Sequence, residues 1–110
     1  MFGIIPKLIW EKRKAADESN RIRMQSTCVL IPTDFHTVLV DTGFGNKHGE
    51  TFRNNHVLEY PAPLIANLRD AGVAPEDVDF VILTHLHFDH AGGCTTRTPD
   101  GQFQPQFPNA

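Results

Sequence analysis

Four side chains that can ligate metal ions lie within six residues, in the run His85-Leu86-His87-Phe88-Asp89-His90. His85 and His87 follow an apolar run, and residues i and i+2 of an extended chain project to the same side, so both imidazoles can reach one point. Asp89 continues this alternation and His90 breaks it. We therefore expect the backbone to turn at His90 and to bring Asp89 and His90 to a second, nearby point. Four nitrogen and oxygen ligands in this spacing suit two adjacent divalent cations that activate water.

An ordinary structural role accounts less well for these residues. A single histidine is usually a plain surface or core residue, but three histidines and an aspartate in this spacing seldom arise by chance. A structural zinc site favours cysteine ligands and a closed shell. Cys94 is not at ligand spacing, and we interpret it as a small packing residue. Gly92 and Gly93 leave room for backbone near the metals and let the chain turn away.

The elements that must position this motif begin with a hairpin. Met24–Leu30 and Thr37–Val40 are rich in β-branched and aliphatic residues, and the turn-forming stretch Pro32–His36 lies between them. The second strand leads directly into Asp41-Thr42-Gly43. Val78–Leu83, just before the histidines, is nearly all apolar, which predicts a strand buried on both faces.

A helix is expected between these strands. In Pro61–Gly72, a proline lies near the start, Leu64 and Leu68 are four apart, and a glycine ends the segment, as in a short amphipathic helix. A turn at Pro75–Asp77 follows it. A helix before a buried strand indicates an α/β fold with helix packed on sheet.

The polar segment Gly45–Tyr60 is predicted to be a loop with a short helical turn. It follows Asp41, so it is expected to border the site. His48, Phe52 and Tyr60 could line a substrate pocket, although an ordinary surface loop explains them better.

Composition limits the classes of function. The 110 residues fit one domain, with 40% hydrophobic and 21% charged residues and a net charge of −3. The basic run Lys12-Arg13-Lys14 lies among charges of both signs, so we expect a solvated face and no nucleic-acid partner. The apolar start is too short to span a bilayer, so no membrane partner is expected. Two distant cysteines favour a reducing compartment, which predicts a cytoplasmic location.

The segment Phe80–Gly93 resembles the signature of metallo-β-lactamase-fold hydrolases. Val38–Gly43, a strand ending in Asp-Thr-Gly, resembles an earlier segment of that family, and Phe2–Trp10 extends the resemblance to the start. The histidine motif is highly specific for the superfamily but says little about substrate. The resemblance implies an α/β protein with the αβ/βα sandwich, two facing β-sheets with helices outside and metals at one edge.

Carried over by motif position, His85 and His87 would bind the first metal, and Asp89 and His90 the second. Asp41 would lie behind the ligands and fix their geometry, as outer-shell groups do; the alternative is a turn-capping aspartate before Gly43. The two metals are expected to be Zn²⁺, although iron or manganese also accepts these ligands.

The resemblance implies metal-assisted hydrolysis of a small-molecule substrate, with Asp89 orienting the attacking water and passing a proton to the leaving group. An ester, lactone, thioester, β-lactam or phosphodiester suits this chemistry. We favour a carboxylic ester or lactone, because the resemblance is to small stand-alone hydrolases.

This sequence departs from the family downstream of the motif. Members of the family add two histidines and a bridging aspartate there, but after Gly93 this chain has no histidine, and its only acidic residue is Asp100. Both ends resemble points inside the family domain. We therefore expect residues 1–110 to be the N-terminal half of the fold, truncated at both ends and inactive alone.

Two rival hypotheses remain. A truncated or split non-catalytic chain would bind metal weakly and need a partner chain, and half a sandwich could also self-associate through its open sheet. A redox relative would hold two irons and pass electrons.

Overall fold

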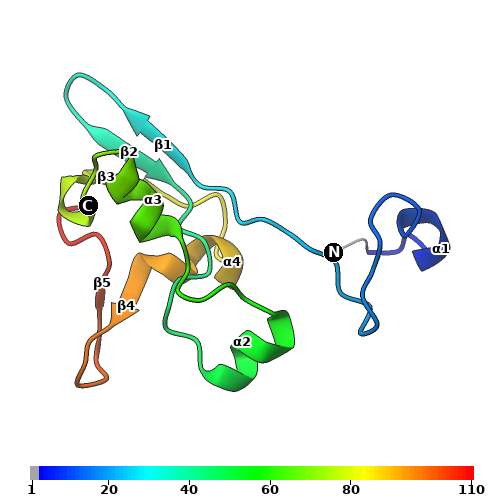
Figure 1. Cartoon of the computed structure of the whole chain (residues 1–110). Helices are drawn as coiled ribbons and strands as arrows, with labels where there is room; N and C mark the ends of the chain where they lie inside the picture. Colours follow the sequence, from blue (N-terminus) through cyan, green and yellow to red (C-terminus); the bar gives the residue numbers. More distant parts are fainter. Residues whose placement is uncertain (1–2) are drawn as a thin grey trace.

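The computed structural model describes residues 3–110. Met1 and Phe2, at which the chain was expected to enter its domain, lie outside the described residues. In chain order the elements are α1 (Lys7–Trp10), β1 (Val29–Pro32), β2 (Thr37–Val40), α2 (Glu50–His56), α3 (Leu64–Asp70), η1 (Pro75–Asp77), β3 (Phe80–Ile82), α4 (Phe88–Ala91), η2 (Gly92–Cys94), β4 (Thr95–Arg97) and β5 (Phe103–Pro105) (Figure 1). The mixed α/β class expected from the sequence is confirmed.

A three-stranded sheet in the order β1-β2-β3 forms the centre of the fold. β1 pairs antiparallel with β2, which confirms the predicted hairpin, whereas β2 and β3 are parallel. The first strand begins at Val29 rather than at Met24 and runs on into Pro32. A proline is tolerated there because β1 is an edge strand, where a missing backbone donor breaks no ladder.

The sheet has one covered face. Leu39 of β2 packs with Leu68 of α3, Val78 and Phe107 in a buried cluster, and Val81 of β3 is packed against that cluster. The amphipathic helix predicted over Pro61–Gly72 is therefore confirmed as α3 and covers this face. The helix ends at Asp70, and the chain turns away at Gly72, whose φ of 78° is readily adopted only by glycine.

The prediction that Val78–Leu83 is a strand buried on both faces is wrong for this structure. The strand is shorter, Phe80–Ile82, and lies at an edge of the sheet. Phe80 and Ile82 are 51% and 54% exposed, because among residues 3–110 only the opposite face, which carries Val81, is packed.

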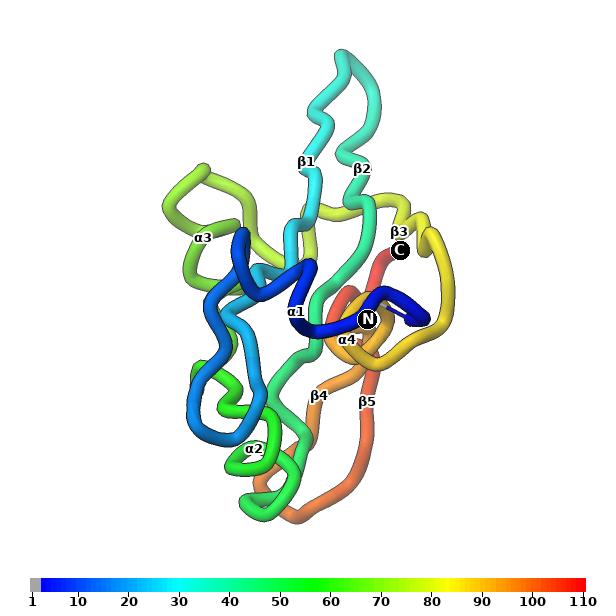
Figure 2. The backbone as a smooth tube through the Cα atoms, turned by 90° about the vertical axis from the view of Figure 1, so that its right-hand side faces the viewer, coloured from blue at the N-terminus to red at the C-terminus, as the bar shows by residue number. Residues whose placement is uncertain are grey.

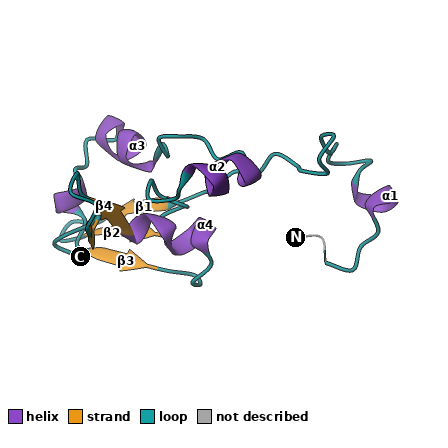
Figure 3. Ribbon diagram, turned by 90° about the horizontal axis from the view of Figure 1, so that it is seen from below, coloured by secondary structure: helices purple, strands orange, loops and turns teal. Residues whose placement is uncertain are grey.

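The two hairpins and α1 extend outward from the centre of the fold (Figure 2 and Figure 3). The β1–β2 hairpin extends from one end of the molecule, and the antiparallel β4–β5 hairpin extends from the other (Figure 2). α1 lies apart from the sheet at the end of a long irregular segment (Figure 3). Gly45–Tyr60, predicted mainly as loop, contains the seven-residue helix α2. No helix within residues 3–110 is long and apolar enough to cross a membrane.

Candidate metal centre

Parallel pairing of β2 and β3 brings two separate segments of the sequence together. Asp41 follows β2, and Thr84-His85-Leu86-His87 follows β3, so both segments leave the sheet at the same edge. The backbone amide of Asp41 donates a hydrogen bond of 2.8 Å to the carbonyl of Ile82, which continues the pairing to this point. Functional groups gather where parallel strands end in this way.

The three histidines of the motif lie next to one another. The ring centroids of His85 and His87 are 4.8 Å apart, and those of His85 and His90 are 3.9 Å apart. The turn expected at His90 begins two residues earlier, at Phe88, where α4 starts after an extended His87. His85 and His87 therefore lie on the exposed strand exit, and Asp89 and His90 lie on a helical turn.

Asp41 is 6% exposed and is directed at the motif rather than at the amides of its own turn. Its carboxylate accepts hydrogen bonds from the amide and hydroxyl of Thr84, both at 2.8 Å, and from Nδ1 of His90 at 2.8 Å. The His90 bond, helped by the Thr84 bonds and opposed by burial, lowers the pKa of Asp41 to about 2. Asp41 is therefore ionised at neutral pH and holds the His90 ring with Nε2 available for a metal ion.

Thr84 holds a second imidazole. Its hydroxyl donates to Asp41, so that hydroxyl accepts from Nδ1 of His85, which lies 3.1 Å away. His85, like His90, then offers Nε2. A histidine that binds a metal ion usually donates its other ring N–H to an oxygen acceptor, and Asp41 and Thr84 provide such oxygens here.

The separation of Asp89 and His90 also fits a shared cation. Oδ2 of Asp89 lies 3.6 Å from Nε2 of His90. Two ligand atoms at about 2.1 Å from one tetrahedral zinc ion lie about 3.4 Å apart. Within residues 3–110, however, no three or more histidine, cysteine or acidic side chains are already arranged around one point. The donor set therefore fits divalent metals in its chemistry, while its members are not all turned toward a common centre.

Backbone contacts fasten α4 to the segment after β2. The amide and hydroxyl of Thr42 both donate to the carbonyl of His90, at 2.7 and 2.9 Å. The hydroxyl of Ser26 donates to the carbonyl of Asp89 at 2.7 Å. The sequence motif gives no sign of Ser26, which approaches from a segment 63 residues away.

Glycines make this contact possible. A Cβ on Gly93 would lie 2.1 Å from the carbonyl oxygen of Thr42, and one on Gly92 would lie 2.4 Å from that of Phe44. Sequence reasoning assigned these glycines to room beside the metals, but their neighbours are the backbone of Thr42 and Phe44. Cys94 is half-buried with its Sγ 3.5 Å from the Thr42 hydroxyl, as expected for a packing residue.

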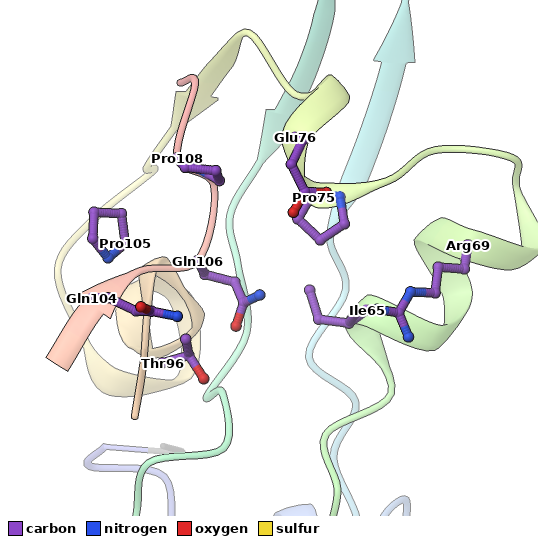
Figure 4. A pocket seen from close by; sticks show the side chains of 9 residues that line it. All are labelled: Ile65, Arg69, Pro75, Glu76, Thr96, Gln104, Pro105, Gln106 and Pro108. Carbon is purple, nitrogen blue, oxygen red and sulfur yellow. The ribbon is translucent and has the colours of Figure 1, made fainter. Parts of the chain in front are cut away.

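Two of the three candidate pocket residues lie near the motif. His48 and Phe52 are in ring contact with Phe88, whereas the ring of Tyr60 lies under the Arg53 guanidinium, 4.0 Å away. A cleft of about 280 Å³ lies elsewhere, between Ile65 and Arg69 of α3 and Gln104 near the chain end (Figure 4). None of the motif histidines lines that cleft, so we do not assign it to the metal centre.

The sequence was compared with protein families and with known proteins. Residues 21–95 match the metallo-beta-lactamase superfamily. An N-acyl homoserine lactonase from Bacillus cereus is 34% identical over 84 residues, which cover 67% of this chain and 34% of the lactonase. A probable metallo-hydrolase from Mycobacterium tuberculosis is 40% identical over 74 residues, covering 59% of this chain and 24% of the relative.

Solved structures of metal-dependent hydrolases also resemble this chain. A probable metal-dependent hydrolase from Staphylococcus aureus superimposes with a TM-score of 0.87 at 35% identity, covering 99% of this chain and 38% of the other. The dizinc quorum-quenching lactonase AidC gives a TM-score of 0.53 at 29% identity, covering 73% and 23%. The chain thus spans about a third of the length of the first curated relatives.

Proposed function

Because this chain belongs to the metallo-β-lactamase superfamily, we propose that it forms part of a metal-dependent hydrolase that opens an ester- or lactone-type bond at a dinuclear site. The observation that carries this proposal is the Asp41–His90 contact, in which a buried carboxylate fixes the imidazole of a candidate ligand. Such a contact is typical of metal sites and has no evident use in a surface loop.

The candidate ligands divide into two pairs. His85 and His87 would hold one cation, and Asp89 and His90 the other. Zinc suits this set of imidazole and carboxylate groups, and iron or manganese also accepts it. When bound, the two cations supply an activated water and polarise the carbonyl of the substrate.

The side chains of this chain have distinct tasks. Asp41 keeps the His90 ring in one orientation through its hydrogen bond to Nδ1. The side chain of Asp89 is 40% exposed, so its carboxylate can reach both water and substrate. We propose that Asp89 orients the attacking water and then carries a proton to the leaving group.

The substrate we propose is a small carboxylic ester or lactone. This choice is supported by the lactonases among the relatives, one of which was solved with the product N-hexanoyl-L-homoserine. We propose neither a nucleic-acid nor a membrane partner. Cys28 and Cys94 are both free thiols, which supports a reducing, cytoplasmic location.

The test is hydrolysis of a lactone panel by the full-length, zinc-loaded protein. We expect ring opening of N-acyl homoserine lactones or simple γ-lactones, measured by proton release, and its loss in Asp89→Ala without loss of the folded state. Asp34→Ala, an exposed aspartate in the β1–β2 turn, is the matched control. Turnover retained in Asp89→Ala would refute the role of Asp89, and failure on every ester and lactone would refute the substrate class.

A second candidate is a non-catalytic chain that binds metal weakly and depends on a partner chain. It is favoured by one observation, the absence within residues 3–110 of three ligands around one point. Two tightly held metals per full-length chain after desalting would exclude it.

A further inference from the structure

Four aromatic rings form a compact group beside the candidate metal centre. Phe52 and His56 lie four residues apart on one side of α2, and His48 lies just before Gly49, the N-cap of this helix. The ring centroids of His48 and Phe52 are 4.5 Å apart and those of Phe52 and His56 are 4.1 Å apart, with stacked planes. Phe88 meets all three rings edge-on, at 5.7, 5.1 and 5.3 Å.

Hydrogen bonds hold the two imidazoles of this group in place. Nε2 of His48 donates to the carbonyl of Phe44 at 2.8 Å, and Nδ1 of His56 donates to the carbonyl of Phe52 at 3.0 Å. The rings of His48 and His56 therefore cannot rotate freely, and the stack presents a fixed surface to Phe88.

Phe88 links this surface to the metal ligands. It is the first residue of α4, directly before Asp89 and His90. α4 has only four residues and no side-chain cap at its N-terminus, and so short a helix has no stability of its own. Its orientation must therefore come from its contacts. Hydrogen bonds from Ser26 and Thr42 reach its carbonyls. Asp41 holds the His90 ring, and the aromatic stack holds Phe88.

We propose that the aromatic group of His48, Phe52, His56 and Phe88 fixes the rotation of α4 and so positions Asp89 and His90 for the second metal ion. The proposal rests on the proposed function. His85 and His87 precede the helical residues of α4, and their ring contacts are with each other and with His90, so the stack reaches them only indirectly. The aromatic group should therefore act mainly on the position formed by Asp89 and His90.

The experiment is a Co²⁺ titration of the full-length, metal-free protein, followed by the visible absorption of the bound cation. Phe52→Leu keeps an apolar side chain but removes the central ring of the stack. We expect the second equivalent to bind about 10–100-fold more weakly, the range for residues that support metal ligands. The first equivalent should keep its affinity and its spectrum.

Two controls separate positioning from general damage. Phe52→Tyr retains the ring and should restore the second affinity, and Phe35→Leu, 87% exposed in the β1–β2 turn, should change neither step. If Phe52→Leu does not fold, as judged by circular dichroism, His56→Leu removes an exposed ring of the same stack and carries the test.

The outcomes are distinguishable. Unchanged second affinity in the folded leucine variant, equal weakening of both equivalents, or failure of Phe52→Tyr to restore binding would overturn the role of the aromatic group. A wild-type protein that takes up no second cation would instead overturn the dinuclear site of the proposed function.

Discussion

The pairing of Asp41 with His90 is the strongest local argument for a metal centre. A buried carboxylate needs several donors to stay ionised, and Asp41 has three, from the amide and hydroxyl of Thr84 and from the imidazole. These bonds orient a ring whose other nitrogen faces Asp89. The sequence could propose Asp41 only by family resemblance, because the pair is separated by 49 residues.

We predict that Asp41→Asn weakens metal binding about 10–100-fold in the full-length protein, as expected when the partner of a metal-binding histidine loses its charge. Competition with a chromophoric chelator measures this affinity. Asp34→Asn, which changes the same charge at an exposed turn residue, should bind as wild type. Equal affinity in Asp41→Asn and wild type would show that Asp41 does not support a ligand.

The reactivity of the Cys28 thiol gives a second test of the negative charge on Asp41. Burial, and secondarily the negative charge of Asp41, raises the pKa of the Cys28 thiol. A raised pKa lowers the thiolate fraction at pH 8, and the thiolate is the reactive form. We predict that iodoacetamide alkylates Cys28 more slowly in the native protein than in urea, and that Asp41→Asn speeds the native reaction. Mass spectrometry of the Cys28 peptide over time gives both rates.

At the scale of elements, strands and helices with a regular spacing of apolar residues could be predicted from the sequence. Elements that depend on contacts with distant segments could not. The hairpin and α3 follow from alternation, from the leucines at 64 and 68, and from glycine at 72. α2 was expected mainly as loop because its residues are polar, and it is stabilised by ring contacts with Phe88 across the fold. Such long-range contacts leave no periodic signal in sequence.

Gly92 and Gly93 lie against the backbone of the segment after β2. This contact predicts very different losses of stability for two glycine-to-alanine substitutions. Gly93→Ala would place a Cβ 2.1 Å from the Thr42 carbonyl oxygen, so we expect it to lower the free energy of unfolding by about 1–3 kcal/mol or more. Gly49→Ala, with no atom within 4 Å, should cost less than about 0.5 kcal/mol. Urea unfolding of full-length variants measures both, and similar values would contradict the described packing.

At the scale of the whole molecule, the sheet has one open apolar face. The pairing register places Val29, Val40 and Ile82 in one row, and Ile31, Val38 and Phe80 in the next. The opposite face carries Leu30, Leu39 and Val81 and is packed. The all-apolar sequence of β3 predicts burial on both faces, but among residues 3–110 only one of them is covered.

We predict that residues 1–110, prepared alone, self-associate through this open face, because exposed contiguous apolar surface favours association. Sedimentation velocity should show species larger than a monomer over the micromolar range. The double substitution Ile31→Lys and Phe80→Lys, on residues already 43% and 51% exposed, should shift the material toward monomer. A monomeric wild-type sample would contradict this prediction.

Part of the candidate site could be read from sequence. The spacing of His85, His87, Asp89 and His90 indicates candidate ligands, since residues so near in sequence must lie close together in space. The supporting contacts of Ser26, Thr42 and the aromatic group could not be predicted, because each depends on a chain path that brings distant segments together.

The central claim, a two-metal site built on this motif, is tested most directly by metal content. The full-length protein and its His87→Ala and His90→Ala variants would be purified with zinc, desalted and analysed by inductively coupled plasma mass spectrometry. We predict close to two zinc ions per wild-type chain and a clear loss in each variant. Equal metal content in all three proteins, or none in the wild type, would contradict the assignment of these residues as ligands.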